Sequence, residues 1–209
     1  MADDIETVRD DLAFMRALAD TPDRANKAMG QAFLAAGIIY GIQGLVQWAS
    51  AIGAITLIGW GYLGFVIGCS VAFLVVLGVI IWKNRGHKSN SAVRRAYEAA
   101  FQGAGLANVC IVIVFIVANI RTGDGGVWYF YTPFIYAIQG VAWYLAFRMR
   151  KRAWLGLVAL GWYAGAVALG LTAHSPTYVL VIALSLILLL AGPGLVMMRV
   201  ADKQSEMAD

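Results

Sequence analysis

Residues 60–82 read WGYLGFVIGCSVAFLVVLGVIIW and contain no Asp, Glu, Lys, Arg or His. A helix of roughly 20 apolar residues crosses the roughly 30 Å hydrocarbon core of a bilayer, so this stretch predicts a membrane-spanning helix. Five further stretches of similar length lack the same residue types: 31–52, 99–120, 127–147, 153–173 and 177–198. The chain is therefore predicted to be an all-α membrane protein, a bundle of six transmembrane helices.

The overall composition supports the same class and limits what else the chain contains. Hydrophobic residues make up 61% of the 209 and charged residues only 13%, which is typical of a bundle of spanning helices. We expect a short cytoplasmic segment at 1–23, a transmembrane domain at 24–200 and a cytoplasmic tail at 201–209. No large soluble domain fits in what remains.

The distribution of Lys and Arg predicts the orientation of the bundle. One side carries thirteen such residues near the span ends: Arg24, Lys27, Lys83, Arg85, Lys88, Arg94, Arg95, Arg148, Arg150, Lys151, Arg152, Arg199 and Lys203. The other side carries only Arg121. By the positive-inside rule both termini are cytoplasmic, in a membrane of the bacterial inner-membrane type. The net charge of +4 then follows from topology and from contact with anionic lipid, so no nucleic-acid partner is expected.

The first 20 residues predict a short amphipathic helix. Ile5, Val8, Leu12 and Met15 recur at three- and four-residue spacing, on an otherwise charged and mainly acidic segment. An acidic helix is not suited to an anionic membrane surface, so we expect its apolar stripe to contact protein. The stripe would pack on the cytoplasmic face of the same chain, on a second copy in a homo-oligomer, or on a soluble partner.

A short sequence match suggests an internal repeat. Ile39–Gly44 reads IYGIQG in the first span, and Ile135–Gly140 reads IYAIQG in the fourth. Because three helices separate the two copies, a true duplication would give a 3+3 repeat of inverted topology. A chance match in a biased composition remains the alternative.

Polar residues of this repeat fall near the middle of the bilayer. Gln43 and Gln139 each lie twelve residues into their spans, about 18 Å at ~1.5 Å per residue. An uncompensated amide at that depth is costly and requires a partner. Together with other polar and aromatic residues at similar depth, they would line a ligand cavity; the candidate set is Tyr40, Gln43, Gln47, Asn108, Tyr136, Gln139 and Trp162. Interhelical hydrogen bonding that only holds helices together is the alternative.

Small and aromatic residues predict how the helices pack and where the membrane surfaces lie. Three pairs with G-x-x-x-G spacing, which allows close approach of two helices, are Gly37/Gly41, Gly64/Gly68 and Gly161/Gly165. Gly192-Pro193-Gly194 predicts a kink or break near the end of the sixth span. Two interfacial belts are expected, with Trp48, Trp60 and Trp128 outside and Trp82, Trp143 and Trp154 inside.

The residue types needed for most catalytic and cofactor chemistry do not occur in the spans. Both histidines, His87 and His174, lie outside them, so no haem or histidine-based metal site is expected. Cys69 and Cys110 are interpreted as small core residues. We expect no cofactor, no metal and no enzymatic activity.

Two functions remain open from the sequence. The first is a non-enzymatic protein that binds a small neutral or apolar molecule near the midplane, for facilitated passage or sensing. The second is a regulatory or structural membrane protein that recruits a soluble partner or subunit through its acidic N-terminal helix.

Overall fold

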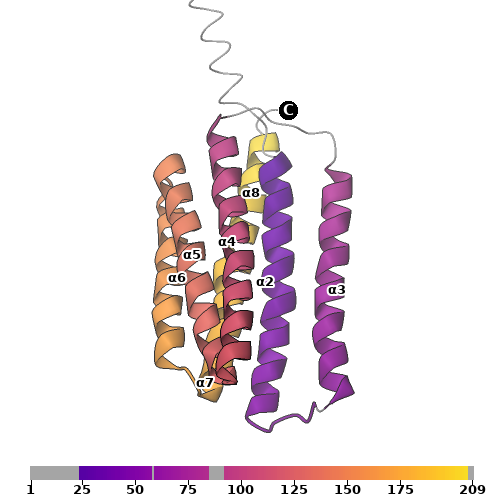
Figure 1. Ribbon diagram of the computed structural model, residues 1–209. Helices are drawn as coiled ribbons and strands as arrows, with labels where there is room; N and C mark the ends of the chain where they lie inside the picture. Colours follow the sequence, from indigo (N-terminus) through magenta and orange to yellow (C-terminus); the bar gives the residue numbers. More distant parts are fainter. Residues whose placement is uncertain (1–23, 58, 85–91, 207–209) are drawn as a thin grey trace, which may run out of the picture.

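The computed structural model describes residues 24–57, 59–84 and 92–206, which form helices and no strands. The long helices are α2 (Arg24–Ala51), α3 (Trp60–Lys83), α4 (Ala92–Thr122), α5 (Trp128–Arg150) and α6 (Ala153–Leu171). The last column joins α7 (Pro176–Leu186), the π-helix η2 (Ile187–Ala191) and α8 (Gly192–Glu206), and a short 3₁₀ helix η1 (Gly125–Val127) precedes α5. These elements make up six columns, and Figure 1 shows that columns consecutive in the chain run in opposite directions. The predicted apolar stripe of the N-terminal segment lies outside the described residues.

Within the described ranges, five helical segments are long and apolar enough to cross a membrane. They are Lys27–Ala51, Trp60–Lys83, Ala99–Thr122, Ala153–Leu171 and Pro176–Lys203. The fourth predicted span corresponds to α5, which is long enough but less apolar because it is rich in Tyr and Trp and carries Gln139. Five of its residues are buried among the other helices. Contact with other helices, rather than with lipid, therefore accounts for its composition.

Glycines on one side of α2 allow it to lie directly against the last column. A Cβ at Gly37 would come within 2.4 Å of the Ala191 backbone nitrogen, and one at Gly41 within 2.4 Å of the Ile187 side chain. At Gly37 no side chain separates the two backbones, and this close approach allows extensive dispersion contacts between the helices. This part of the predicted close packing, at Gly37/Gly41, is confirmed.

The irregularity predicted at Gly192-Pro193-Gly194 takes the form of a π-helix. Pro193 has no N–H to donate to the carbonyl four residues back, and its ring would clash with that carbonyl in a regular α-helix. The wider turn of η2, at Ile187–Ala191, ends two residues before this proline, and α8 then runs from Gly192 to Glu206. The helix is distorted locally and is not broken.

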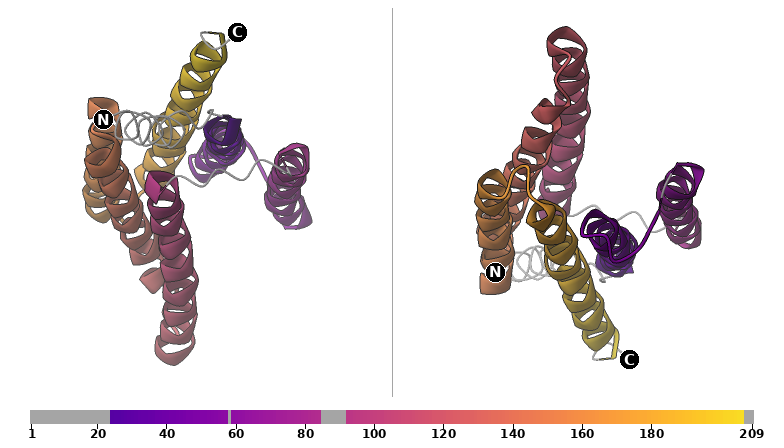
Figure 2. Two further views of the ribbon diagram at one scale, coloured as in Figure 1. Left: turned by 90° about the horizontal axis from the view of Figure 1, so that it is seen from above. Right: turned by 90° about the horizontal axis from the view of Figure 1, so that it is seen from below.

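The six columns are unevenly packed. α5 packs closely on α6, whereas α3 packs mainly on α2 and α4 mainly on α5. Figure 2 accordingly shows α3 and α4 at separate edges of the assembly. In the predicted inverted repeat, α2, α3 and α4 correspond to α5, α6 and the last column. In agreement with this correspondence, α2 packs on α3 and the last column, and α5 packs on α6 and α4. The inverted repeat itself stays a prediction.

Three of the sequence expectations about packing are wrong. Cys110, interpreted from the sequence as a small core residue, is exposed on α4. The Gly64/Gly68 pair on α3 contacts nothing: a Cβ at either position would meet no atom within 4 Å. Trp143 is not at a membrane interface, because its side chain is 0% exposed and lies in the core of the helix assembly. By contrast, Trp60 and Trp82 at the two ends of α3 are 87% and 68% exposed, as side chains of an interfacial belt would be.

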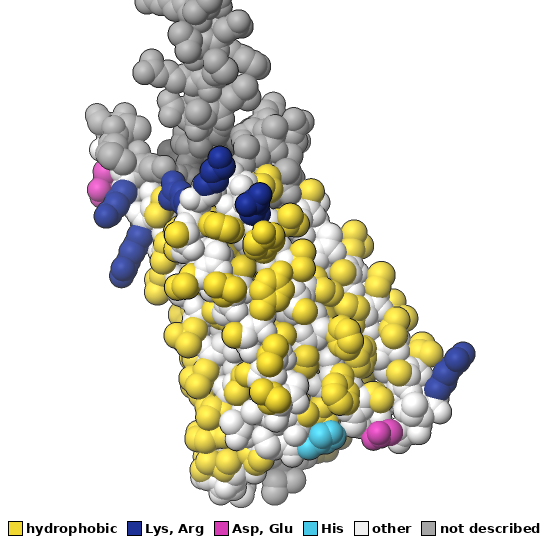
Figure 3. Space-filling view, turned by 90° about the vertical axis from the view of Figure 1, so that its left-hand side faces the viewer, with side chains coloured by type: hydrophobic (Ala, Val, Ile, Leu, Met, Phe, Trp, Pro, Cys, Tyr) yellow, Lys and Arg dark blue, Asp and Glu magenta, His cyan; other side chains and the backbone are white. Residues whose placement is uncertain are grey.

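Charged side chains lie at the two ends of the columns. Figure 3 shows most of the described Lys and Arg side chains at one end, and a single basic side chain with an Asp and a His at the other. At the basic end, Lys27 on α2 forms a salt bridge with Asp202 on α8, with 2.5 Å between Nζ and Oδ1. The long apolar surface between these ends is the part that a bilayer would cover.

Candidate functional site

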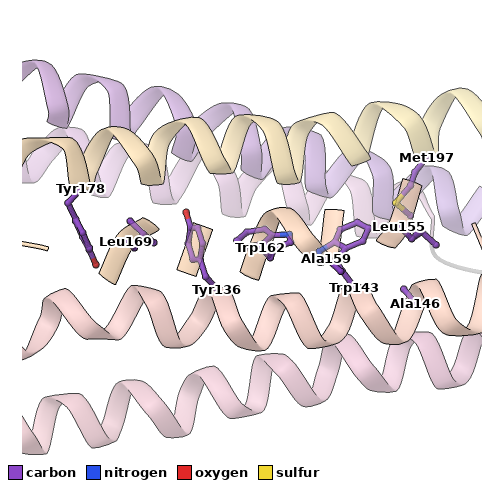
Figure 4. Packing of buried hydrophobic residues seen from close by; sticks show 9 residues of the cluster. All are labelled: Tyr136, Trp143, Ala146, Leu155, Ala159, Trp162, Leu169, Tyr178 and Met197. Carbon is purple, nitrogen blue, oxygen red and sulfur yellow. The ribbon is translucent and has the colours of Figure 1, made fainter. Parts of the chain in front are cut away.

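The most completely buried side chains form an aromatic core along the α5–α6 interface, which also reaches α7 and α8. Figure 4 shows its nine members. They are Tyr136, Trp143, Ala146, Leu155, Ala159, Trp162, Leu169, Tyr178 and Met197.

Small residues on α5 and α6 make room for these rings. A Cβ at Gly140 would come within 2.6 Å of the Tyr163 ring, and one at Gly165 within 3.0 Å of the Tyr136 ring. Tyr136 in turn packs edge-on against Trp162, with ring centroids 4.7 Å apart. The Tyr136 hydroxyl donates to the Ile182 carbonyl on α7 at 3.4 Å. These contacts fix two of the predicted site residues, Tyr136 and Trp162, against each other.

A proline in α5 explains a hydrogen bond that ties α7 to α5. Pro133 lies inside α5 and has no N–H, so the carbonyl of Tyr129, four residues back, has no helical donor. The Tyr178 hydroxyl on α7 donates to this carbonyl at 2.9 Å. This bond therefore satisfies a backbone group that the proline leaves without its helical donor.

We expect Tyr178→Phe to lower the free energy of unfolding by about 1 kcal/mol, because it leaves the Tyr129 carbonyl without a donor. In a Pro133→Ala background, the backbone N–H of residue 133 can donate to the Tyr129 carbonyl. The Tyr178→Phe substitution should then lower the free energy of unfolding much less. Unfolding in mixed detergent micelles by sodium dodecyl sulfate measures both differences. Equal losses in the two backgrounds would show that the hydroxyl acts elsewhere.

Asn108 on α4 has a partner in α5. The Tyr131 hydroxyl donates to Asn108 Oδ1 at 2.7 Å, and the Tyr131 ring packs against Phe115 of α4 with centroids 5.7 Å apart. This is interhelical hydrogen bonding of the kind that holds membrane helices together. We therefore interpret Asn108 as a residue that holds two helices together and not as part of a ligand cavity.

The three glutamines of the predicted site have no such partner. Gln43, Gln47 and Gln139 are half-buried, and none forms a hydrogen bond within the described part of the chain. The Gln43 Oε1 atom is fully buried and unpaired.

Two indole nitrogens are also buried without a partner among the described residues. They are Nε1 of Trp143 and Nε1 of Trp162, whose side chains are 0% and 2% exposed. Most buried polar atoms in folded proteins are hydrogen-bonded, and each exception requires an explanation, such as a bound water or ligand. The indole nitrogens of Trp143 and Trp162 both require such an explanation.

The seven predicted site residues are spread over several helix contacts. Tyr136 and Trp162 meet at the α5–α6 interface, Tyr40 contacts α3, and Asn108 contacts α5. Two shallow grooves on the described surface involve none of the seven. One lies between α4 and α5 and is lined by Ala100, Gly103, Ala104, Ala107, Ile138, Val141, Ala142 and Leu145. The other lies between α2 and α3 and is lined by Ala28, Met29, Ala32, Leu77, Ile80, Ile81 and Asn84.

Sequence reasoning missed three residues of the core and its surroundings. The sequence predicts Trp143 in the inner interfacial belt, whereas its side chain is 0% exposed. Tyr178 could have been found through Pro133. A proline inside a helix leaves the carbonyl four residues back without its N–H donor, which implies a donor on a neighbouring helix. Tyr131, the partner of Asn108, had no signal in the sequence, because two helices must be docked before such a pair is visible.

No protein-family model, curated protein or solved structure matches this chain. The fold therefore defines only a class: an all-helical protein with several helices that are long and apolar enough to span a membrane.

Proposed function

We propose that this chain is a non-enzymatic, multi-pass membrane protein that binds a small neutral or apolar molecule among its helices, for facilitated passage or sensing. The observation that carries the proposal is the buried, unpaired Oε1 atom of Gln43, accompanied by the unbonded amides of Gln47 and Gln139. If these residues only held helices together, they would be paired across helices, as Asn108 and Tyr131 are. A ligand or its accompanying water supplies the missing partners.

The chemistry of the helix interior favours an uncharged ligand. The predicted spans contain no ionisable Asp, Glu, Lys, Arg or His. A charged molecule would lose its hydration in such an interior without gaining a counter-ion, which costs several kcal/mol or more. The same composition offers no histidine or carboxylate that would act as a general base, so we propose no enzymatic role.

The amides provide the direct test. Gln43→Leu and Gln139→Leu should each change the free energy of unfolding by about 1 kcal/mol or less, because an amide without a protein partner contributes little to stability. Each should nevertheless lower the amount of any co-purifying small molecule about tenfold, since one hydrogen bond to the ligand is lost. Extraction and mass spectrometry of the protein purified in lipid nanodiscs measure this amount. Gln102→Leu on α4, an exposed amide, is the matched control and should have no effect.

Two results would contradict this function. One is equal recovery of the same compound from the wild type and both variants. The other is the absence of any compound enriched over empty nanodiscs, combined with the same unfolding free energy in all proteins.

The orientation belongs to the same proposal. We propose that both termini face the cytoplasm of a bacterial cell, with the chain in the inner membrane, on the basis of the Lys and Arg asymmetry. Alkaline phosphatase fused after residue 124 should then be active, and the same enzyme fused after residue 88 should be inactive, because it folds only outside the cytoplasm. The reverse pattern would invert the topology of the whole chain.

Recruitment of a soluble partner or of a second copy through Ile5, Val8, Leu12 and Met15 is a separate proposal. It rests on the sequence pattern, because these residues lie outside the described structure.

A further inference from the structure

The groove between α2 and α3 lies at the basic end of the molecule. Figure 1 shows the start of α2 and the end of α3 at the same end of the assembly. Lys27 directly precedes Ala28 on one side of the groove, and Lys83 directly precedes Asn84 on the other. Lysines at both positions indicate that this part of the groove lies at the level of the lipid headgroups. Lipid tails therefore do not cover all of its apolar surface.

Small and exposed apolar side chains form this groove. Ala28 and Ala32 are one turn apart on α2, so they leave space on that side of the helix. On α3 the groove is lined by Leu77, Ile80 and Ile81, and the Ile81 side chain is 53% exposed. An apolar surface of this kind at a polar boundary is typical of a binding site for another protein segment.

We infer that the groove between α2 and α3 binds the chain's own N-terminal segment, residues 1–23, through the apolar stripe Ile5, Val8, Leu12 and Met15. Docking of this kind does not depend on ligand binding by the helix interior. A soluble partner that used the same stripe would have to displace the segment from the groove.

The length of the segment matches the depth of the groove. Thr21-Pro22 follows the amphipathic stretch, and a residue before proline is disfavoured in a helix, so a turn is expected there. Leu12 lies eight residues before Asp20, and Ala32 lies eight residues after Arg24, where α2 begins. At about 1.5 Å per helical residue, both are about 12 Å from this turn. A helix folded back at Thr21-Pro22 therefore brings Leu12 level with Ala32.

Charge favours the same arrangement. Residues 1–23 contain seven acidic and two basic side chains. Lys83, beside the groove, is exposed and forms no salt bridge with any residue that the structure describes. Attraction between opposite charges directs the segment toward this end of the molecule, and burial of the apolar stripe stabilises the contact.

Disulfide cross-linking of the full-length protein in lipid nanodiscs tests the docking. Cys69 and Cys110 are first replaced by Ala, and Leu12→Cys is then combined with Ile81→Cys. A disulfide requires Cα atoms about 4–7 Å apart, so rapid cross-linking within one chain is expected only if the segment occupies the groove. The matched control combines Leu12→Cys with Leu145→Cys, since Leu145 lines the other groove and is 43% exposed. Cross-linking of the control pair should be at least about tenfold slower.

Two neighbouring substitutions separate the stripe from the rest of the segment. Met15→Asp places a carboxylate in the stripe, where burial against apolar side chains is costly, and should slow cross-linking of positions 12 and 81 about tenfold or more. Phe14→Asp adds the same charge at a position that helical spacing puts off the stripe, and it should change the rate little. The far-ultraviolet circular dichroism of each variant should closely match the cysteine-free parent, which separates release of the segment from loss of the fold.

Other results would overturn this docking. Equal rates for the two cysteine pairs, or no cross-link in either, would show that the segment does not occupy this groove. A cross-link found only between two copies, at twice the mass on a non-reducing gel, would assign the stripe to a homo-oligomer. Equal effects of Met15→Asp and Phe14→Asp would show that the stripe does not make the contact.

Discussion

Gly37→Ala should lower the free energy of unfolding by about 3 kcal/mol, although it adds a single methyl group. The added Cβ would lie 2.4 Å from the Ala191 backbone nitrogen, 2.7 Å from the Leu186 carbonyl oxygen and 2.8 Å from the Ala191 Cβ. Two of these atoms belong to the backbone, which cannot move away as a flexible side chain would. α2 must therefore separate from η2, and dispersion contacts along the whole α2–α7–α8 interface weaken.

Gly64→Ala is the matched control, because Gly64 has the same G-x-x-x-G spacing. A Cβ there meets nothing within 4 Å, so the substitution should be neutral or stabilise α3 by up to about 1 kcal/mol through helix propensity. Unfolding in mixed micelles, followed by circular dichroism, compares the two variants. Equal losses at Gly37 and Gly64 would mean that α3 packs on a further helix, for example in a second copy.

Trp143→Ala should lower the free energy of unfolding by about 3–5 kcal/mol, the range for removal of a buried Trp or Phe side chain. The ring contacts Phe33 of α2 and Phe101 of α4, each with centroids 5.5 Å away, and Trp154 of α6 at 6.4 Å. It therefore joins four helices in one place. The rings of Phe33 and Phe101 also pack against each other, with centroids 5.7 Å apart. Removal of the Trp143 ring would therefore take a packing partner from both.

Two comparisons isolate the cause of that loss. Trp143→Phe retains most of the ring contacts and should cost clearly less than Trp143→Ala. Trp60→Ala removes a side chain of the same type that is 87% exposed, and it should change the unfolding free energy little. If Trp60→Ala were as destabilising as Trp143→Ala, burial in the core would not explain the effect.

Part of the candidate site was predictable from the sequence. Counting residues from the span ends predicts that Gln43 and Gln139 lie at mid-depth, and the cost of burying an amide predicts that each needs a partner. Trp162 was singled out because it lies far from both ends of its span. Counting along one helix gives depth, but it does not give the direction in which a side chain points or the helix that it faces.

The contacts themselves required the folded structure. Asn108 looked like the glutamines in the sequence, yet it is paired with Tyr131, whereas Gln43 is not paired. Trp143 looked like a belt residue because its distance from Arg148 suits an interfacial position. Its burial results from contacts with α2, α4 and α6, which are distant in the sequence.

The sequence alone determined that this chain is helical and able to span a membrane. Long stretches without charge leave the backbone no partner in lipid except itself, and a helix satisfies every such group within one stretch. Only the tertiary structure decided which glycines lie in helix contacts, which tryptophan is buried and which polar atoms have no partner. Those outcomes depend on close packing between residues far apart in the chain, and a pattern of spacing within one helix contains no information about the surface opposite it.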